Sequence, residues 1–309
     1  MSSRKRWRER RSRLLRGLVS AILPLVRLLG WRGAQRLGAT LGAVAWRLDR
    51  KNGQRALDNL EIAFPEASDT ERRRLAGRCA RHLGTTLGEA LYVMAAGAEV
   101  VAPQIEVEGW EEIEAARARG RGILILTGHC GHWEILGIPL TRGGLEVSAV
   151  AREMEETATQ EMVLDLRREI GTRTIARGAT GSARRLLAAI RGKQALAMLI
   201  DQDTRVDGTW VPFFGRLAFT PLGAAELVQR ADLVVIPSFI ERRPDGTHLA
   251  RFLPALDLAD DPREATALMT NAIEDQIRRV PEQWVWMHRR WRRRPPEEEE
   301  TTSAGADPY

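Results

Sequence analysis

Cysteine is scarce in this chain, and two familiar catalytic motifs are missing. The 309 residues include only two cysteines, Cys79 and Cys130, which cannot form a disulfide framework and favour a reducing compartment. The chain has no His-Glu-x-x-His sequence, the helical motif of zinc proteases. It also has no Gly-x-Ser-x-Gly turn, in which many hydrolases hold a nucleophilic serine. Transfer through a serine acyl-enzyme is therefore not expected.

An uninterrupted apolar run of the ~20 residues that a membrane-spanning helix needs is also lacking. The apolar stretch 14–30 is broken by Pro24 and Arg27, and residues 1–16 carry eight basic side chains against one acid. No signal-peptide cleavage site follows. We expect residues 1–50 to form a basic, apolar helical anchor that lies on or dips into an anionic leaflet. The alternative is an ordinary amphipathic helix with a solvated basic tail.

Charge and composition leave several partners open. The formal net charge is +6, and 44% of the residues are hydrophobic, enough to fill the core of one large domain or two small ones. A basic surface suits nucleic acid, anionic lipid or an acidic carrier protein. No nucleic-acid fold signature accompanies the charge, so we predict no nucleic-acid partner.

The pattern of the chain changes near residue 104. Residues 31–103 read as helices, and Ser68 with Glu71 forms the capping box that starts one of them. Beyond them, strands alternate with helices. This alternation predicts an α/β fold with a mostly parallel central sheet flanked by helices, preceded by an N-terminal helical membrane-associating region. We expect strands at 105–109, 123–126, 145–151, 173–176, 195–201 and 233–240, and helices at 110–119, 158–170, 182–191, 222–230 and 263–279.

Domain organisation follows from the same pattern. We predict that residues 51–295 form the catalytic domain, with a helical lead-in to about residue 103. Residues 296–309 contain a run of glutamates at 297–300, followed mostly by small and polar residues, a composition that predicts a disordered tail.

One stretch, residues 122–134, carries the first candidate chemistry. A short apolar strand ends at Thr127 and Gly128, and His129 follows at the sheet edge where α/β proteins bind ligands. Glu134 comes five residues later, near the start of an expected helix whose first turn precedes Pro139. We predict that His129 is a general base and that Glu134 bonds one ring nitrogen and orients it.

Two other readings of this stretch are weaker. Cys130 and His132 suggest a metal site, but no second cluster supplies further ligands, so no metal and no cofactor is expected. Cys130 adjoins the predicted base and is also a candidate nucleophile, but it occurs singly and would need an activated thiolate.

A second candidate cluster, Asp201, Gln202 and Asp203, follows another predicted strand. These polar side chains are candidates for binding a substrate hydroxyl or a neighbouring arginine. The Val-Pro-Phe-Phe sequence at 211–214 suits either an acyl-chain groove or plain core packing. Among the basic residues, Arg152, Arg167 and Arg168 could each stabilise an oxyanion or a phosphate.

Tryptophan and arginine alternate in residues 281–295. This pattern is typical of a membrane interface, where indole rings lie at headgroup level and guanidinium groups meet phosphate.

Together, these motifs resemble those of the lipid A biosynthesis late acyltransferases, which belong with the glycerophosphate acyltransferases. The resemblance rests on His-Cys-Gly-His-Trp-Glu at 129–134, on Asp-Gln-Asp at 201–203 with Val-Pro-Phe-Phe-Gly at 211–215 and Thr-Pro at 220–221, and on Pro-Glu-Gln-Trp-Val-Trp-Met-His-Arg-Arg at 281–290. It runs from about residue 15 to residue 295, with the motifs in the family's order.

The resemblance implies an inner-membrane enzyme on the cytoplasmic face of a bacterial cell. Such an enzyme moves a fatty acyl group from an acyl-acyl carrier protein to a hydroxyl of a membrane lipid acceptor. By position, His129 is the base and Glu134 its partner. Of the two adjacent arginines, we choose Arg168 as the electrostatic stabiliser, with Arg152, Asp201, Gln202 and Asp203 as substrate-binding candidates.

Two departures from the family pattern bear on the acceptor. The family commonly has asparagine at the position of His132 and an aromatic residue at the position of Ala151. A different acceptor, such as another glycolipid, an ornithine lipid or a lysophospholipid, therefore stays open. A non-catalytic protein that binds anionic lipid is the alternative from another class.

Overall fold

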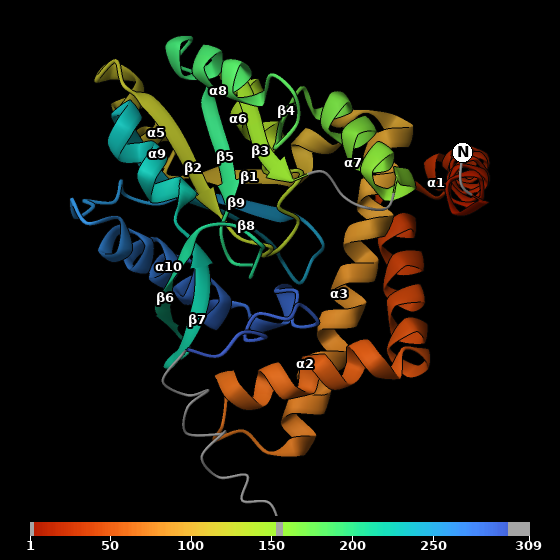
Figure 1. Cartoon of the computed structure of the whole chain (residues 1–309). Helices are drawn as coiled ribbons and strands as arrows, with labels where there is room; N and C mark the ends of the chain where they lie inside the picture. Colours follow the sequence, from red (N-terminus) through yellow and green to blue (C-terminus); the bar gives the residue numbers. More distant parts are fainter. Residues whose placement is uncertain (1–2, 153–156, 296–309) are drawn as a thin grey trace, which may run out of the picture.

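A seven-stranded sheet, in the order β1-β9-β8-β2-β5-β3-β4, forms the centre of the computed structural model (Figure 1). The model describes residues 3–152 and 157–295, with the backbone alone at 3–13, 15 and 157. The predicted disordered tail at 296–309 lies outside the described residues. A separate antiparallel hairpin, β6–β7, lies below the sheet in Figure 1.

The sheet is mostly parallel, as predicted. Strands β8, β2, β5, β3 and β4 run in one direction, while β9 is antiparallel to β8 and carries β1 parallel to itself. The strands are β1 (Ile105–Glu108), β2 (Gly122–Thr127), β3 (Val147–Arg152), β4 (Arg173–Arg177), β5 (Ala195–Leu199), β6 (Gly208–Phe213), β7 (Arg216–Pro221), β8 (Leu233–Arg242) and β9 (His248–Phe252).

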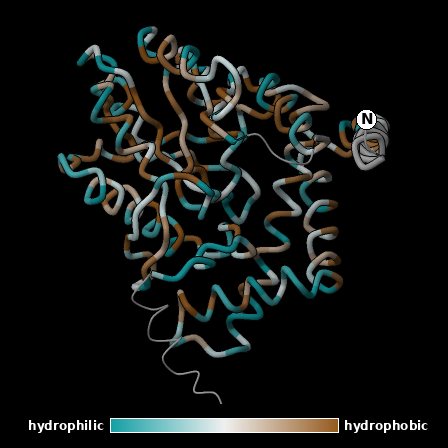
Figure 2. The backbone as a smooth tube through the Cα atoms, in the orientation of Figure 1, coloured by the Kyte–Doolittle hydropathy of each residue, from teal (hydrophilic) through white to brown (hydrophobic). Residues whose placement is uncertain are grey.

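Strand β2 is buried on both faces, which explains its unbroken apolar sequence. Leu124 and Leu126 face one core cluster, and Ile123 and Ile125 face the other, because successive side chains of a strand point to opposite sides. Figure 2 shows hydrophobic colour concentrated along the central strands. The sheet therefore has a core on each face, and its strand ends are free to carry polar groups.

Helices cover both faces of the sheet and build the N-terminal part of the molecule (Figure 1). They are α1 (Ser3–Leu48), α2 (Arg50–Ala63), α3 (Asp69–Ala96), α4 (Ala98–Val101), α5 (Trp110–Ala118), α6 (Gly137–Arg142), α7 (Thr157–Ile170), α8 (Ser182–Arg191), α9 (Gly223–Ala231) and α10 (Pro262–Arg279), with short 3₁₀ turns at Ala102–Gln104 and Pro281–Gln283. The capping box predicted for Ser68 and Glu71 is confirmed at the start of α3.

Helix α1 changes direction at Gly30, whose φ of 69° is the left-handed conformation that glycine adopts without strain. Its second half packs on α3 through glycines, and a Cβ on Gly42 would lie 2.1 Å from the carbonyl oxygen of Ala80. Small residues thus bring the two backbones into close contact. The boundary predicted at residue 50 coincides with the break between α1 and α2, and it stays a prediction.

The structure corrects several expected elements. The loop expected after residue 201 contains the β6–β7 hairpin, and β9 was not foreseen. The helix expected from Trp133 begins only at Gly137, so Glu134 lies in the preceding turn. Pro139 therefore falls within the first turn of α6, where the missing N–H has no helical partner in any case.

Candidate active site

His129 and Asp201 come together because β2 and β5 are parallel neighbours. Thr127 at the end of β2 is in register with Leu199 at the end of β5, and each polar residue follows two positions later. Nδ1 of His129 lies 2.8 Å from Oδ1 of Asp201. The strand ends therefore form a histidine–carboxylate pair at the rim of the sheet.

Asp201 is a fully engaged carboxylate. Its Oδ2 accepts the backbone N–H of His129 and the indole N–H of Trp284, each at 2.8 Å. Burial opposes ionisation, but these bonds and the contact with the His129 ring outweigh it and hold the pKa of Asp201 well below its ordinary value. An ionised Asp201 requires the proton of a neutral His129 to be on Nδ1, which leaves Nε2 as the basic nitrogen.

Glu134 does not contact the ring of His129 as expected. Instead it forms a two-pronged ion pair with Arg167, at 2.7 Å to Nε and 2.8 Å to Nη2. Both side chains are largely buried. The ring nitrogen that was assigned to Glu134 belongs to Asp201, because the strand register brings Asp201 beside the histidine while Glu134 turns toward α7.

The two adjacent arginines of α7 lie in different surroundings, and the choice of Arg168 stays a prediction. Arg168 is 72% exposed in its side chain and pairs with Asp165 on the same helix. Arg167 faces Glu134 and also donates to Thr174 at 3.2 Å. Neighbouring helical residues point about 100° apart, so only one of the two can face the site.

Gln202 connects His129 to a second histidine, His288. The amide nitrogen of Gln202 lies 2.9 Å from Nε2 of His129 and 2.8 Å from Nε2 of His288. Burial, together with the nearby His129, lowers the pKa of His288 to about 4, so its ring is neutral at pH 7. One amide group therefore donates to both imidazoles and occupies the basic nitrogen of His129.

Asp203 and Arg152, the remaining predicted binding residues, lie apart from this pair. Asp203 is buried and ion-paired with Arg292 and Arg293 at 3.0 and 3.2 Å, which agrees with the expectation of a neighbouring arginine. Arg152 ends β3 beside Arg177 of β4. Burial and the charge of Arg152 both lower the pKa of Arg177. Whether either residue contacts substrate stays a prediction.

The loop that carries His129 packs closely against β8 at Gly131 and is contacted by a side chain of α3. A Cβ on Gly131, whose φ is 60°, would lie 1.6 Å from the carbonyl oxygen of Ile240, so only glycine fits. Nε2 of His82 lies 3.2 Å from the carbonyl oxygen of Gly131, and Nδ1 lies 2.5 Å from Arg242. Arg242 in turn pairs with the buried Glu89. The loop after His129 is thus held by contacts with β8 and α3.

The two cysteines and His132 are buried structural groups. Burial raises the pKa of the Cys130 thiol well above its ordinary value, so the reactive thiolate is absent at neutral pH. Burial lowers the pKa of His132 to about 3. Among residues 3–152 and 157–295, no group of three or more His, Cys, Asp or Glu side chains is arranged to hold a metal ion.

The tryptophans at 284 and 286 and the two phenylalanines of the Val-Pro-Phe-Phe sequence lie in the core. Trp284 and Trp286 are buried, and Arg290 is enclosed with bonds to the Phe219 carbonyl oxygen and to Thr220, both at 2.6 Å. The membrane-interface interpretation of this segment is therefore wrong. Phe213 is also buried, in contact with Trp284. Of the two interpretations of the Val-Pro-Phe-Phe sequence, an acyl-chain groove and core packing, this contact supports core packing.

The sequence also matches a known protein family. The model of the family described as bacterial lipid A biosynthesis acyltransferase matches residues 4–293. The chain belongs to this family.

Similar proteins come from several bacteria. The lipid A biosynthesis acyltransferase of Haemophilus influenzae is 24% identical over 267 residues, covering 86% of this chain and 83% of its own length. The lipid A biosynthesis lauroyltransferase of Escherichia coli is 26% identical over 278 residues, covering 88% and 89%. The phosphatidylinositol mannoside acyltransferase of Mycobacterium tuberculosis is 23% identical over 190 residues, covering 60% and 59%.

Membership makes this chain an acyltransferase, which takes an acyl donor and a lipid acceptor. The alternative of a lipid-binding protein without catalysis is thereby set aside. The ionised Asp201 leaves Nε2 of His129 as the unprotonated ring nitrogen, which is the state of the imidazole that can accept a proton.

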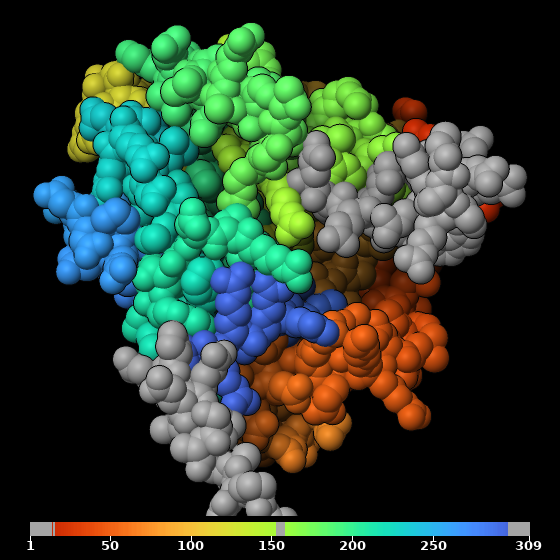
Figure 3. All heavy atoms as spheres, in the orientation of Figure 1, coloured from red at the N-terminus to blue at the C-terminus, as the bar shows by residue number. Residues whose placement is uncertain are grey.

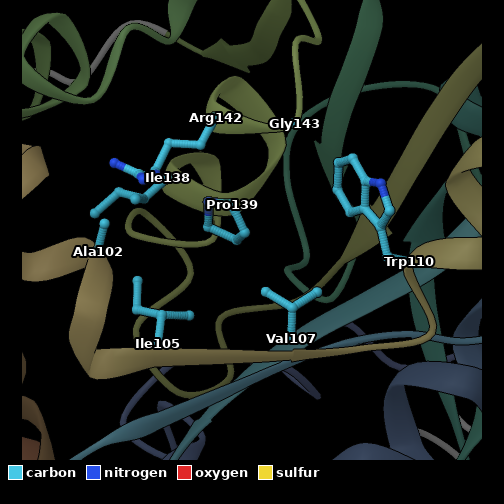
Figure 4. A pocket seen from close by; sticks show the side chains of 8 residues that line it. All are labelled: Ala102, Ile105, Val107, Trp110, Ile138, Pro139, Arg142 and Gly143. Carbon is cyan, nitrogen blue, oxygen red and sulfur yellow. The ribbon is translucent and has the colours of Figure 1, made fainter.

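Two cavities of this acyltransferase are lined by neither His129 nor Asp201. The hollow in Figure 4, about 340 Å³, lies between β1 and α6 and contains none of the residues of the histidine–carboxylate pair. A narrower cavity of about 30 Å³ lies beside Trp133, Glu134 and Arg167. Its volume suits one or two water molecules, so it does not hold an acyl chain in this conformation.

Proposed function

We propose that this acyltransferase moves a fatty acyl group from an acyl-acyl carrier protein thioester to a hydroxyl of a lipid A precursor. The observation that carries the proposal is the imidazole of His129, held as a base by Asp201 at the rim of the sheet. The names of the relatives supply the acceptor class. The basic composition of the chain suits an acidic carrier protein and a phosphorylated lipid.

The mechanism begins with deprotonation of the acceptor. Gln202 releases Nε2 of His129, and the acceptor hydroxyl takes its place there. The imidazole removes the hydroxyl proton while the oxygen attacks the thioester carbonyl, a contribution of roughly 10²–10⁴-fold in rate. The ionised Asp201 stabilises the imidazolium that forms. Collapse of the tetrahedral intermediate forms the ester and releases the carrier thiolate, which takes the proton from His129.

His129→Ala is expected to abolish most turnover while the protein stays folded. The test is transfer of a radiolabelled acyl chain from acyl-acyl carrier protein to a purified lipid A precursor, with the wild-type enzyme in parallel. His132→Ala and His248→Ala are weaker controls because both histidines are buried. Arg191→Ala, an exposed change on α8, serves as the matched control. Full activity of His129→Ala would reject the assignment of the base.

A second acceptor class has one specific observation in its favour. The phosphatidylinositol mannoside acyltransferase of Mycobacterium tuberculosis matches 60% of this chain. An acceptor panel that includes a phosphatidylinositol mannoside next to the lipid A precursor separates the two. The preferred acceptor is the one with the higher kcat/KM, and transfer to the mannoside alone would replace the lipid A assignment.

We also propose that the acyltransferase acts at the cytoplasmic face of the inner membrane through α1. Residues Arg16–Leu48 form a helix long and apolar enough to cross a membrane, and only 17% of its most apolar window is buried. A basic groove of about 480 Å³ lies beside it, lined by Ala43, Trp46, Arg47, Arg74, Gly77, Arg78 and Arg81. Exposed leucines next to arginines suit insertion into an anionic leaflet.

Leu28→Asp is expected to weaken binding to phosphatidylglycerol vesicles by on the order of tenfold, because Leu28 is exposed on α1 and a carboxylate resists burial in lipid. Vesicle co-sedimentation measures the change. Leu187→Asp, an equally drastic change of an exposed leucine on α8, is the matched control. Equal binding of both variants would argue against α1 as the contact.

A further inference from the structure

A polar pocket of about 260 Å³ is lined by Gln202 and His288, two neighbours of His129. It forms where three separate parts of the chain meet: α2, the turn after β5, and the segment after α10. Figure 3 shows the orange surface of α2 against the blue surface of the final segment on the face in view. The lining residues are Arg55, Gln202, Asp203, Met287, His288, Arg289 and Arg292.

The pocket shares a wall with the basic nitrogen. Gln202 and His288 line it, and Gln202 bonds Nε2 of His129 at 2.9 Å. The rings of His129 and His288 lie 5.3 Å apart between centroids. A molecule with its hydroxyl at Nε2 in place of the Gln202 amide therefore extends its neighbouring groups into this pocket.

Positive charge in the pocket exceeds the negative charge. The one acidic residue in its lining, Asp203, is buried and already shared between Arg292 and Arg293. Arg289 is exposed and has no hydrogen-bond or ion-pair partner in the described parts of the chain. Arg55 donates to the side chain of Asn52 at 3.0 Å and attracts the nearby Asp49.

Hydrogen bonds between α2 and the final segment fix the wall that carries these arginines. The amide of Asn59 in α2 donates to the carbonyl oxygens of Trp286 and His288, both at 2.6 Å. These bonds fix the final segment against α2, so that Arg289 and Arg55 line the same pocket. The histidine in the wall is neutral at pH 7, so it adds no charge of its own.

We propose that this pocket binds a phosphate group of a substrate and thereby places the reacting hydroxyl at His129. The inference rests on the proposed function, and it adds the residues that recognise the substrate. Guanidinium groups bind phosphate oxygens with paired, charge-assisted bonds, which favours phosphate over a neutral sugar. The phosphate comes either from the headgroup of the acceptor lipid or from the phosphopantetheine arm of the acyl donor.

Arg289→Ala and Arg55→Ala test the pocket by steady-state kinetics, with the concentrations of acceptor and donor varied separately. Loss of one charged contact is expected to raise one KM about tenfold or more, with a small change in kcat. A higher KM for the lipid acceptor assigns the acceptor phosphate, and a higher KM for the acyl-acyl carrier protein assigns the donor phosphate. Arg289→Lys is expected to restore part of the loss, and Arg191→Ala, on α8, to change neither KM.

Two further measurements separate this inference from the proposed function. With a phosphatase-treated lipid A precursor, wild type and Arg289→Ala should have the same KM if the acceptor phosphate is the ligand. Calorimetric titration with inorganic pyrophosphate needs no turnover, and binding should be weaker in Arg289→Ala by a similar factor. Unchanged KM values for both arginine variants, or equal pyrophosphate binding, would overturn the pocket even if His129→Ala is inactive. An active His129→Ala overturns the proposed base instead.

Discussion

Asp201→Asn is expected to lower kcat for acyl transfer by about 10²–10⁴-fold while the protein stays folded. The cause is the tautomer of His129. Oδ2 of Asp201 accepts two N–H groups, from the His129 backbone and from Trp284, so the oxygen of an asparagine side chain takes that position. The NH₂ group then faces Nδ1 of His129 and donates to it. The ring proton moves to Nε2, where a base is required.

Two measurements check this expectation. Turnover is measured with the acyl donor and acceptor at saturation, and the thermal midpoint shows that the variant is folded. Nitrogen NMR of labelled histidine reports which ring nitrogen of His129 carries the proton, a readout that a merely structural role of Asp201 does not change. Asp165→Asn, the same chemical change in an exposed ion pair, is the control. A kcat within threefold of wild type for Asp201→Asn would contradict the assignment.

Much of this site follows from the sequence, because polar residues after apolar strands mark the reactive edge of a parallel sheet. His129, Asp201 and Gln202 were all selected in that way, and the structure brings them within bonding distance. Their partnership was missed because it depends on strand order. Strands β2 and β5 are separated by two other strands along the chain, and only the sheet makes them neighbours.

The residues that sequence reasoning misplaced depend on tertiary packing. Glu134 is close to His129 along the chain, but it faces α7. The reason is that residues 132–136 form a turn and helix α6 begins only at Gly137. Trp284 belongs to a segment whose composition is typical of a membrane interface, yet its indole N–H lies in the core and donates to Asp201. His288 lies within the same tryptophan-rich segment and contacts Gln202 in the folded chain. Nothing in the sequence places it there.

Removal of the Glu134 carboxylate is expected to produce the largest loss of stability. In Glu134→Ala the guanidinium of Arg167 stays buried without its partner, a change that costs about 3–5 kcal/mol. For a chain of this size, the thermal midpoint should fall by roughly 6–20 °C. Arg168→Ala is the control, because Arg168 on the same helix is exposed and its ion pair contributes little.

The double variant Glu134→Met with Arg167→Met separates a structural pair from a catalytic one. Apolar residues of similar size leave no buried charge, so its unfolding free energy should recover much of what Glu134→Ala loses. Calorimetry of the four proteins in the cycle measures the coupling. If Glu134 oriented His129, Glu134→Ala would lose turnover with little loss of stability. The protein would stay folded, and only the imidazole of His129 would lose its partner. Because Asp201 holds that ring, the thermal midpoint of Glu134→Ala should instead fall together with its activity. A stable but inactive Glu134→Ala would contradict this expectation and assign Glu134 as the partner of His129.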